Sequence, residues 1–155
     1  MSLSALIVAR NEQNNIKECL ESLSFVDEIV VVLDRTNDDT ERITKKYTKK
    51  IFSGSWEFEG DRRNFGIKKC CSDWVLEIDA DEIVSEKLSF EIKKNILEED
   101  IDFFYLPLLN FVSGKKIKYG WMACMAPDGK FCLFKKNCKT WENESVHPNY
   151  NLKGK

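Results

Sequence analysis

Two carboxylates directly after an apolar run have the type and spacing that could do chemistry. Asp79 and Asp81 follow the apolar run Trp74 to Ile78 and are separated by Ala80. Carboxylates so close together repel each other unless a cation or hydrogen-bond donors lie between them. A hard divalent cation that bridges carboxylate and phosphate oxygens would offset the repulsion between the two carboxylates. The spacing indicates phosphate or metal chemistry, and the alternative is a solvated loop capped by short polar residues.

Two other polar loops follow apolar runs in the same way. The first run, near the N-terminus, is followed by Arg10, Asn11 and Glu12, and the second, EIVVVL, is followed by Asp34. If the three runs are parallel neighbouring strands, all three loops open on one edge of a sheet. Parallel sheets bind ligands at that edge, at the carboxyl ends of their strands. Solvation explains each loop by itself, but the three together favour a ligand site.

The elements that must position these loops alternate between strands and helices. Continuous apolar runs over residues 3–9, 28–33 and 74–78 predict strands that are covered on both faces. Between them, apolar residues recur at helical spacing, and Asn14 is the expected N-cap of the first helix. We expect helices over about residues 16–23, 40–47, 60–71 and 86–97, further strands over 50–53, 103–109 and 131–134, and a hairpin between Phe111 and Tyr119.

This alternation predicts an α/β fold, with a mostly parallel, Rossmann-like sheet and helices on both faces. The sequence has no internal repeat, low-complexity stretch or linker, so we expect one domain over residues 1–155. Of the residues, 43% are hydrophobic, enough to bury a core without disulfides or a metal. The six cysteines form no CxxC pair and His147 is the only histidine. Structural zinc spacings are therefore absent, and we expect reduced thiols.

The charge balance argues against polyanionic partners. The chain has 24 basic and 26 acidic residues, so it has no global attraction for nucleic acid or an anionic membrane. The basic cluster from Arg42 to Lys50 is interpreted as a solvated helix face, and the alternative is contact with an anionic glycolipid or membrane surface. No signal peptide is visible, and no apolar run approaches the roughly 20 residues of a membrane span. We expect a cytoplasmic protein with at most peripheral membrane contact.

Four blocks, in order, resemble the family 2 glycosyltransferases of GT-A fold. The resemblance is strongest to the bacterial group that extends lipopolysaccharide cores, and it covers about residues 2–100 well. A lone DxD motif would be weak support, but four blocks at strand ends or on the helix before the DxD strand are specific. The blocks are Val8–Glu12; Asp34 with Thr36, Asp38 and Thr40; Arg63–Gly66; and Asp79–Glu82.

The resemblance implies transfer of a sugar from a nucleotide-diphosphate donor, typically a UDP-sugar, to a glycan or lipopolysaccharide acceptor. It also implies inversion of the anomeric configuration and Mn²⁺ or Mg²⁺ as cofactor. Asp34 would accept a hydrogen bond from the base, Arg63 would stand near the diphosphate, and Asp81 would coordinate the catalytic metal. The residues so assigned to the nucleotide sugar are Ala9, Arg10, Asn11, Glu12, Asp34, Arg63 and Asp79, and those assigned to the metal are Asp79, Asp81 and His147.

The downstream part departs from the pattern of the family. Residues 131–136 and Val146–His147 are similar to its closing block, but Pro148 follows the histidine where the family commonly has glutamate. The usual Glu-Asp pair at the position of the catalytic base is absent. We choose Glu144 as the candidate base, with Asp128 as the second candidate. His147 is either a third metal ligand or a structural histidine.

Two other functions stay open. Residues 1–100 are expected to bind the nucleotide sugar and residues 101–155 to form a shortened acceptor-side part, so a truncated, non-catalytic nucleotide-sugar-binding module is the first alternative. A pyrophosphorylase is the second, but it would need a glycine-rich phosphate loop, and residues 9–13 contain no glycine. Four residues are interpreted as core, with an acceptor groove as the alternative: Trp121, Met122, Met125 and Trp141.

Overall fold

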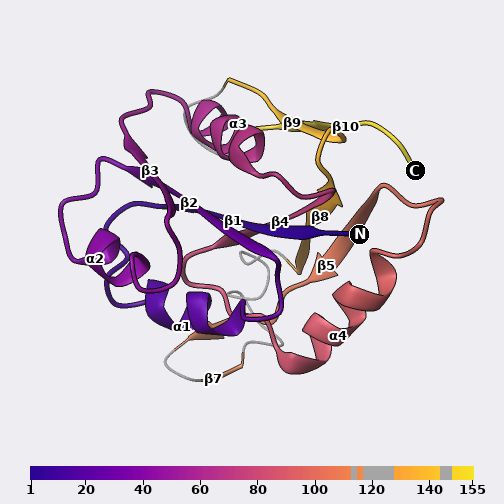
Figure 1. Ribbon diagram of the computed structural model, residues 1–155, viewed down its shortest axis with the longest axis horizontal. Coiled ribbons are helices and arrows are strands. Elements are labelled where there is room, and N and C mark those ends of the chain that lie inside the picture. Colours follow the sequence, from indigo (N-terminus) through magenta and orange to yellow (C-terminus); the bar gives the residue numbers. More distant parts are fainter. Residues whose placement is uncertain (113–114, 117–127, 144–147) are drawn as a thin grey trace.

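The structure is a computed structural model that describes residues 1–112, 115–116, 128–143 and 148–155. Its centre is a six-stranded sheet with helices on both faces (Figure 1). The strand order in this sheet is β3–β2–β1–β4–β8–β5. The predicted α/β fold with a mostly parallel sheet is therefore confirmed.

Four adjacent parallel strands make up the larger part of the sheet. They are β1 (Leu3–Ala9), β2 (Glu28–Asp34), β3 (Lys50–Gly54) and β4 (Trp74–Asp79). β1 lies between β2 and β4 and pairs with both. All but one residue of β1 and all but one of β4 are buried, because helices cover both faces of the sheet. Burial on both faces explains why these strands read as continuous apolar runs.

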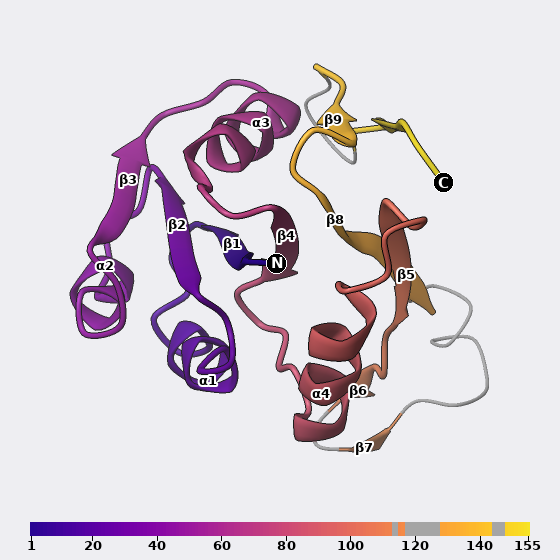
Figure 2. The ribbon, with the colours of Figure 1, turned by 45° about the vertical axis from the view of Figure 1, so that its right-hand side comes forward.

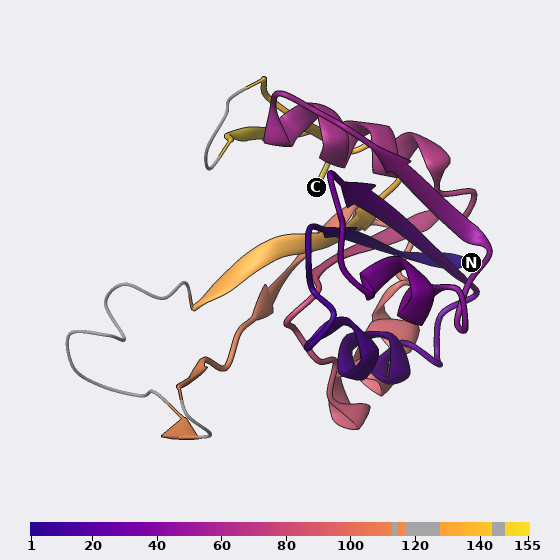
Figure 3. The ribbon, with the colours of Figure 1, turned by 90° about the vertical axis from the view of Figure 1, so that its left-hand side faces the viewer.

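The other two strands return along the same sheet. β8 (Gly129–Lys135) is antiparallel to β4 on one side and to the edge strand β5 (Phe103–Pro107) on the other. Because the direction is reversed, the first residues of β8 lie at the end of the sheet where β4 finishes. In Figure 3, β5 and β8 extend past the ends of the parallel strands on this side.

The helices form two layers, as Figures 1 and 2 show. One face of the sheet carries α1 (Ile16–Ser22), α2 (Thr40–Thr44) and α4 (Glu86–Asn95). The other face carries α3 (Glu59–Lys69) and a two-stranded antiparallel ribbon of β9 (Lys139–Trp141) and β10 (Tyr150–Leu152). The predicted hairpin is confirmed as far as Lys116, with β6 (Phe111–Val112) paired to β7 (Lys115–Lys116), and its continuation to Tyr119 lies outside the described residues.

Alternate residues of β1 face two separate hydrophobic clusters. Leu3 and Ile7 pack in the cluster that includes α1 and α4, whereas Leu6 packs with Ile67 of α3. Gly66 allows α3 to lie close to the sheet, because a Cβ atom there would meet Leu6 Cδ1 at 2.5 Å. The apolar alternation of one strand thus fixes the positions of both helix layers.

Two details of the predicted helices are wrong. Asn14 is not the N-cap of α1; Asn15 holds that position, and its side chain makes no capping hydrogen bond. A hydrogen-bonded turn from Glu12 to Asn15 delays the helix by one residue. α2 ends at Thr44 instead of near Tyr47, because the Tyr47 N–H donates to the carbonyl three residues earlier and tightens the last turn.

The described residues include five of the six cysteines. Cys19, Cys70, Cys71, Cys132 and Cys138 are free thiols, as expected. Burial raises the pKa of the Cys19 and Cys132 thiols to about 12, so both are neutral at ordinary pH. In the part of the chain that the structure describes, no helix is long and apolar enough to cross a membrane.

Candidate functional site

Hydrogen bonds join the loop after β1 to the segment that follows β2. The Asn37 N–H donates to Asn11 Oδ1 at 2.9 Å, and the Glu12 N–H donates to Thr40 Oγ1 at 2.8 Å. Asn11 and Arg35 have positive φ angles of 57° and 48°, a region that residues with a Cβ rarely adopt. Each loop therefore turns sharply just after its strand, and the structure brings these two polar loops together.

The first of these loops contributes both backbone and side chains. Ala9 ends β1 and is buried, whereas Arg10 and Asn11 are exposed. Glu12 is partly buried, and its carboxylate accepts a hydrogen bond from Asn15 Nδ2 at 2.9 Å. Its carbonyl oxygen also accepts from the Ile16 N–H at the start of α1. Glu12 therefore helps to begin α1, the structural role that its place before a helix allows.

Asp34, the last residue of β2, is a buried carboxylate surrounded by donors. It accepts hydrogen bonds from Arg35 Nε and Nη2 at 3.1 and 3.0 Å, from Arg62 Nη1 at 3.0 Å and from the Trp56 N–H at 3.1 Å. Burial raises the pKa of Asp34, but the hydrogen bonds from Arg35 and Trp56 lower it by more. The pKa of Asp34 therefore lies below its ordinary value. Asp34 is thus an ionised acceptor at the end of β2.

Two buried polar atoms near Asp34 lack a hydrogen-bond partner among the described residues. They are Thr36 Oγ1, in the same sequence block, and Nε of Arg62, the arginine that binds Asp34. Buried polar atoms are rarely left unpaired, because losing water without a replacement costs free energy. A polar ligand that offers its own donors and acceptors would satisfy them.

Arg63 lies at the opposite end of the site, between α3 and β4. Its guanidinium donates to Glu59 Oε1 at 2.9 Å and to Glu77 Oε1 and Asp79 Oδ1 at 3.3 Å each. The guanidinium carbon also lies 4.9 Å from the centre of the Trp141 ring. With only 15% of its side chain exposed, Arg63 is not a solvated surface charge. Three carboxylates and an aromatic face hold this cation at the end of β4.

Asp79 meets a lysine that the sequence did not indicate. Lys130 Nζ lies 2.9 Å from Asp79 Oδ2 and 2.6 Å from Glu82 Oε2. Burial raises the pKa of Asp79, but the charges of Lys130 and Arg63 lower it by more, so the pKa of Asp79 is below the ordinary value. For Glu82, burial dominates and raises the pKa despite the same lysine. Lys130 therefore stabilises the ionised form of Asp79 and, less completely, that of Glu82.

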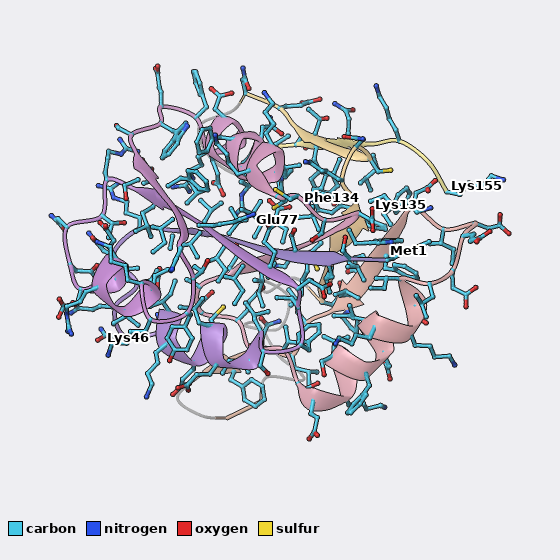
Figure 4. All side chains as sticks on the ribbon, in the orientation of Figure 1. Met1, Lys46, Glu77, Phe134, Lys135 and Lys155 are labelled. Carbon is cyan, nitrogen blue, oxygen red and sulfur yellow. The ribbon has the colours of Figure 1, made fainter. Side chains whose placement is uncertain are left out.

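Glu77, which pairs with Arg63, also forms a buried ion pair with Lys139. Lys139 Nζ lies 2.7 Å from Glu77 Oε2, and both side chains are 3% exposed. Trp141 Nε1 also donates to Glu77, at 2.9 Å, and its ring lies 4.1 Å from the Lys139 ammonium. Figure 4 labels Glu77 in the interior of the molecule. Trp141 is thus packed against the charged groups that position Arg63, which agrees with its interpretation as a core residue.

The remaining predicted residues are less tightly gathered. Asp81 is exposed, two residues beyond Asp79. Asp128 is exposed and accepts a hydrogen bond from the Tyr105 hydroxyl at 2.7 Å. Glu144 and His147 lie outside the described residues. The candidate base and the third candidate metal ligand therefore stay predictions.

The fit of a divalent cation depends on what else is bound. Among the described residues, no three carboxylate, thiol or imidazole groups come together as a metal shell. Asp79 and Glu82 instead share a lysine ammonium, so a cation is already present between them. Both oxygens of Asp79 already have cationic partners, so a divalent ion here would rely on the exposed Asp81 and on phosphate oxygens and water, which Mg²⁺ commonly keeps as ligands.

Sequence reasoning missed three cations of this site. Arg35 follows Asp34 and Arg62 precedes Arg63 in the sequence. This adjacency to predicted site residues was the only signal for either arginine. Lys130 had none, because it lies 51 residues after Asp79 and reaches it only through the return of β8. A parallel strand predicts its own loop, but not the side chain that a later antiparallel strand brings to that loop.

The structure thus has acidic residues at the carboxyl ends of two parallel strands of an α/β sheet. The sequence matches the model of glycosyl transferase family 2 over residues 4–136. The chain therefore belongs to glycosyl transferase family 2.

Two curated relatives illustrate the similarity in sequence. An uncharacterized glycosyltransferase of Rickettsia conorii is 35% identical over 92 residues, which are 59% of this chain and 33% of the relative. The lipopolysaccharide core biosynthesis glycosyltransferase LpsC of Rhizobium meliloti is 29% identical over 93 residues, which are 57% of this chain and 34% of LpsC. The chain thus spans about a third of the length of these relatives.

Two solved structures illustrate the similarity in fold. TarS of S. aureus, residues 1–349 in complex with UDP-GlcNAc, has a TM-score of 0.59 and 25% identity, over 77% of this chain and 37% of TarS. Glucosyl-3-phosphoglycerate synthase of Mycobacterium tuberculosis, in complex with Mg²⁺ and UDP, has a TM-score of 0.56 and 22% identity, over 66% of this chain and 42% of the synthase. The GT-A fold that the sequence blocks implied is confirmed.

Proposed function

We propose that this chain binds a UDP-sugar and transfers the sugar to a glycan or lipopolysaccharide acceptor with inversion of the anomeric carbon. One observation carries the proposal. An ionised acceptor, Asp34, and a carboxylate–cation group around Asp79 lie at the carboxyl ends of β2 and β4, on either side of β1. A base acceptor at one end and charge for a diphosphate at the other match the two ends of a nucleoside diphosphate.

The base side of the site would be formed by the first two loops. Asp34 would accept a hydrogen bond from the imide N–H of uracil, and Thr36 Oγ1 and Arg62 Nε offer unpaired polar atoms near it. The loop Ala9–Glu12 would line the base and ribose, because hydrogen bonds between backbone N–H groups and side-chain oxygens hold it beside the Asp34 loop. The complex of TarS with UDP-GlcNAc supports uridine as the nucleoside.

The diphosphate side would be formed by α3, β4 and β8. Arg63 presents donors that suit phosphate oxygens, and it is held in place by Glu59 and Glu77. Asp81, with Asp79, would hold Mn²⁺ or Mg²⁺, which as a Lewis acid would neutralise the diphosphate leaving group. The complex of the mycobacterial synthase with Mg²⁺ and UDP supports this cofactor class.

The acceptor hydroxyl needs a base that removes its proton as the sugar is transferred. Such a base commonly contributes about 10²–10⁴-fold to the rate. Glu144 is the proposed base and Asp128 the second candidate. Asp128 Oδ1 accepts a hydrogen bond from the Tyr105 hydroxyl at 2.7 Å, so the proton would go to the other carboxylate oxygen. We further propose that residues 1–155 act as one domain, in the cytoplasm, with at most peripheral contact with a membrane.

A donor panel tests the function. The purified chain is incubated with radiolabelled UDP-sugars and Mn²⁺, and sugar release or transfer is measured; at least one donor should be consumed. In parallel, UDP with Mn²⁺ should raise the melting temperature, with linkage worth about 2.7 kcal/mol at 100-fold over Kd. UDP binding without turnover of any donor would favour the non-catalytic module. Absence of UDP binding would contradict the proposal altogether.

A further inference from the structure

Lys130 lies between two carboxylates of the candidate site. Its ammonium contacts Asp79 Oδ2 at 2.9 Å and Glu82 Oε2 at 2.6 Å. The side chain is 26% exposed, so it is neither a free surface lysine nor sealed in the core. A cation that bridged these two carboxylates would have to be where this ammonium is.

The surroundings hold Lys130 in this place. Asp79 Oδ1 is bound by Arg63, and the Asp79 N–H donates to Glu82 Oε2 at 3.0 Å, so both carboxylates are fixed relative to the backbone of β4. Lys130 itself is fixed by β8, where it is paired opposite Leu106 of β5. The carboxylates come from the end of β4 and the loop that follows it, and the cation comes from β8, so the contact depends on the fold of the sheet.

The carboxylates need this charge. The Asp79 and Glu82 side chains are 40% and 21% exposed, and two ionised carboxylates this close together repel each other. Arg63 balances only part of the negative charge, because it is shared with Glu59 and Glu77. A diphosphate that approached this edge without a further cation would meet net negative charge. Lys130 and a divalent metal therefore serve the same electrostatic purpose.

We propose that Lys130 is a resident cation of this site: its ammonium neutralises the Asp79–Glu82 pair and does for a bound nucleoside diphosphate part of what a divalent metal would do. The inference rests on the proposed function, since it concerns the same diphosphate position. It follows that nucleotide binding depends less on metal than it would without Lys130. A metal held by Asp81 and Asp79 would compete with the ammonium for Asp79 Oδ2, and the released ammonium can then turn to the phosphate oxygens as a flexible point charge.

The test compares UDP affinity with and without metal. Calorimetry gives the Kd of UDP in Mn²⁺ and in EDTA, and the ratio of the EDTA value to the Mn²⁺ value measures metal dependence. In Lys130→Met, UDP binding in EDTA should weaken about tenfold or more through loss of a charged contact, while Mn²⁺ binds without a competitor. The ratio should therefore rise at least about tenfold over wild type.

Three variants make the result specific. Lys130→Arg keeps the charge and should keep a ratio near that of wild type. Lys135→Met removes a lysine of the same strand that binds Asp102, and Figure 4 labels it on the side of the molecule where Met1 lies. It should leave the ratio unchanged. Lys130→Gln serves in place of the Met variant if the latter does not fold, which circular dichroism would show.

The outcomes separate the inference from the proposed function. If Lys130 is only structural, its removal weakens UDP binding equally in Mn²⁺ and in EDTA, and the unchanged ratio overturns the inference while UDP binding stands. If wild type binds no UDP in either condition, the proposed function fails and the inference with it. A ratio that rises in Lys130→Met but not in Lys130→Arg or Lys135→Met supports the resident cation.

Discussion

The parallel strands and the later strands of the chain differ in the charged residues that they themselves bring to the site. The parallel strands β2 and β4 end in carboxylates, Asp34 and Asp79, whereas the antiparallel strand β8 and the ribbon strand β9 bring the ammonium groups of Lys130 and Lys139. Both ammonium groups bind carboxylates of β4. The late segments of the chain therefore complete the electrostatics of a site that the early strands begin.

The largest effect is expected where this pairing is most buried. Glu77→Gln removes the charge that balances Lys139, which is 3% exposed, and it also loosens the support of Arg63. Breaking a buried pair from one side costs about 3–5 kcal/mol, because the other charge stays buried. The free energy of unfolding, from urea denaturation, should fall by this amount.

The pH dependence of Glu77→Gln provides a check of its cause. Burial lowers the pKa of Lys139 in the folded chain even with Glu77 present, and without Glu77 the pKa should fall further. Between the folded and unfolded pKa values of a lysine, the unfolded chain binds more protons, so stability rises with pH. The deficit of the variant should therefore shrink as pH is raised from 7 towards 10. A deficit that does not change with pH would contradict an uncompensated ammonium.

The next effect separates metal binding from proton transfer. Asp81→Asn keeps the size of the side chain and removes the charge that would hold the metal, so both UDP–Mn²⁺ affinity and transfer should fall. Glu144→Gln removes only a proton acceptor, so turnover should fall by about 10²-fold or more while UDP affinity stays. Steady-state transfer and calorimetry on both variants measure this. Full activity in Glu144→Gln would exclude that residue as the base.

The two parts of the sheet also differ in how much the sequence predicted. β1, β2 and β4 were predicted within a residue, because burial on both faces leaves a continuous apolar run. The run 131–134 indicated a strand, but neither its direction nor its neighbours, β4 and β5. Strand pairing depends on contacts between distant segments, and local propensity does not encode them. The Asn14 cap failed for a local reason, the turn that precedes α1.

The candidate site follows the same division. Asp34 and Asp79 could be predicted, because each directly follows a buried strand. Their partners could not, since Arg62 reaches Asp34 over 28 residues and Lys130 reaches Asp79 over 51. The sequence predicted a metal between Asp79 and Asp81, and the structure adds a lysine between Asp79 and Glu82 that the spacing did not indicate. Which charges meet is a property of topology and not of spacing.

A smaller effect is expected at the base side. Asp34→Asn should weaken UDP by about 1–3 kcal/mol, the amount typical of a hydrogen bond to a charged group. Arg35 and Arg62 would also lose their ionic partner, so unfolding is measured beside calorimetric UDP binding. Asp39→Asn is the control, because it pairs only with Arg42 on an exposed face among the ion pairs described. Unchanged UDP affinity in Asp34→Asn would remove this residue from the site.

The smallest effect is expected at an ion pair with the same length as the buried one. Lys45 Nζ lies 2.7 Å from Glu41 Oε1, as Lys139 Nζ does from Glu77, but the side chains of Lys45, at the end of α2, and Glu41, within it, are 64% and 44% exposed. Water and salt screen such a pair, and an i,i+4 pair on a helix is worth about 0.3–0.5 kcal/mol. Glu41→Gln should therefore lower the free energy of unfolding by no more than this, and the loss should vanish in 1 M salt. If Glu41→Gln lowered the free energy of unfolding as much as Glu77→Gln, distance and not burial would set the strength of the ion pairs in this fold. The basic residues on and after α2 would then be more than a solvated surface.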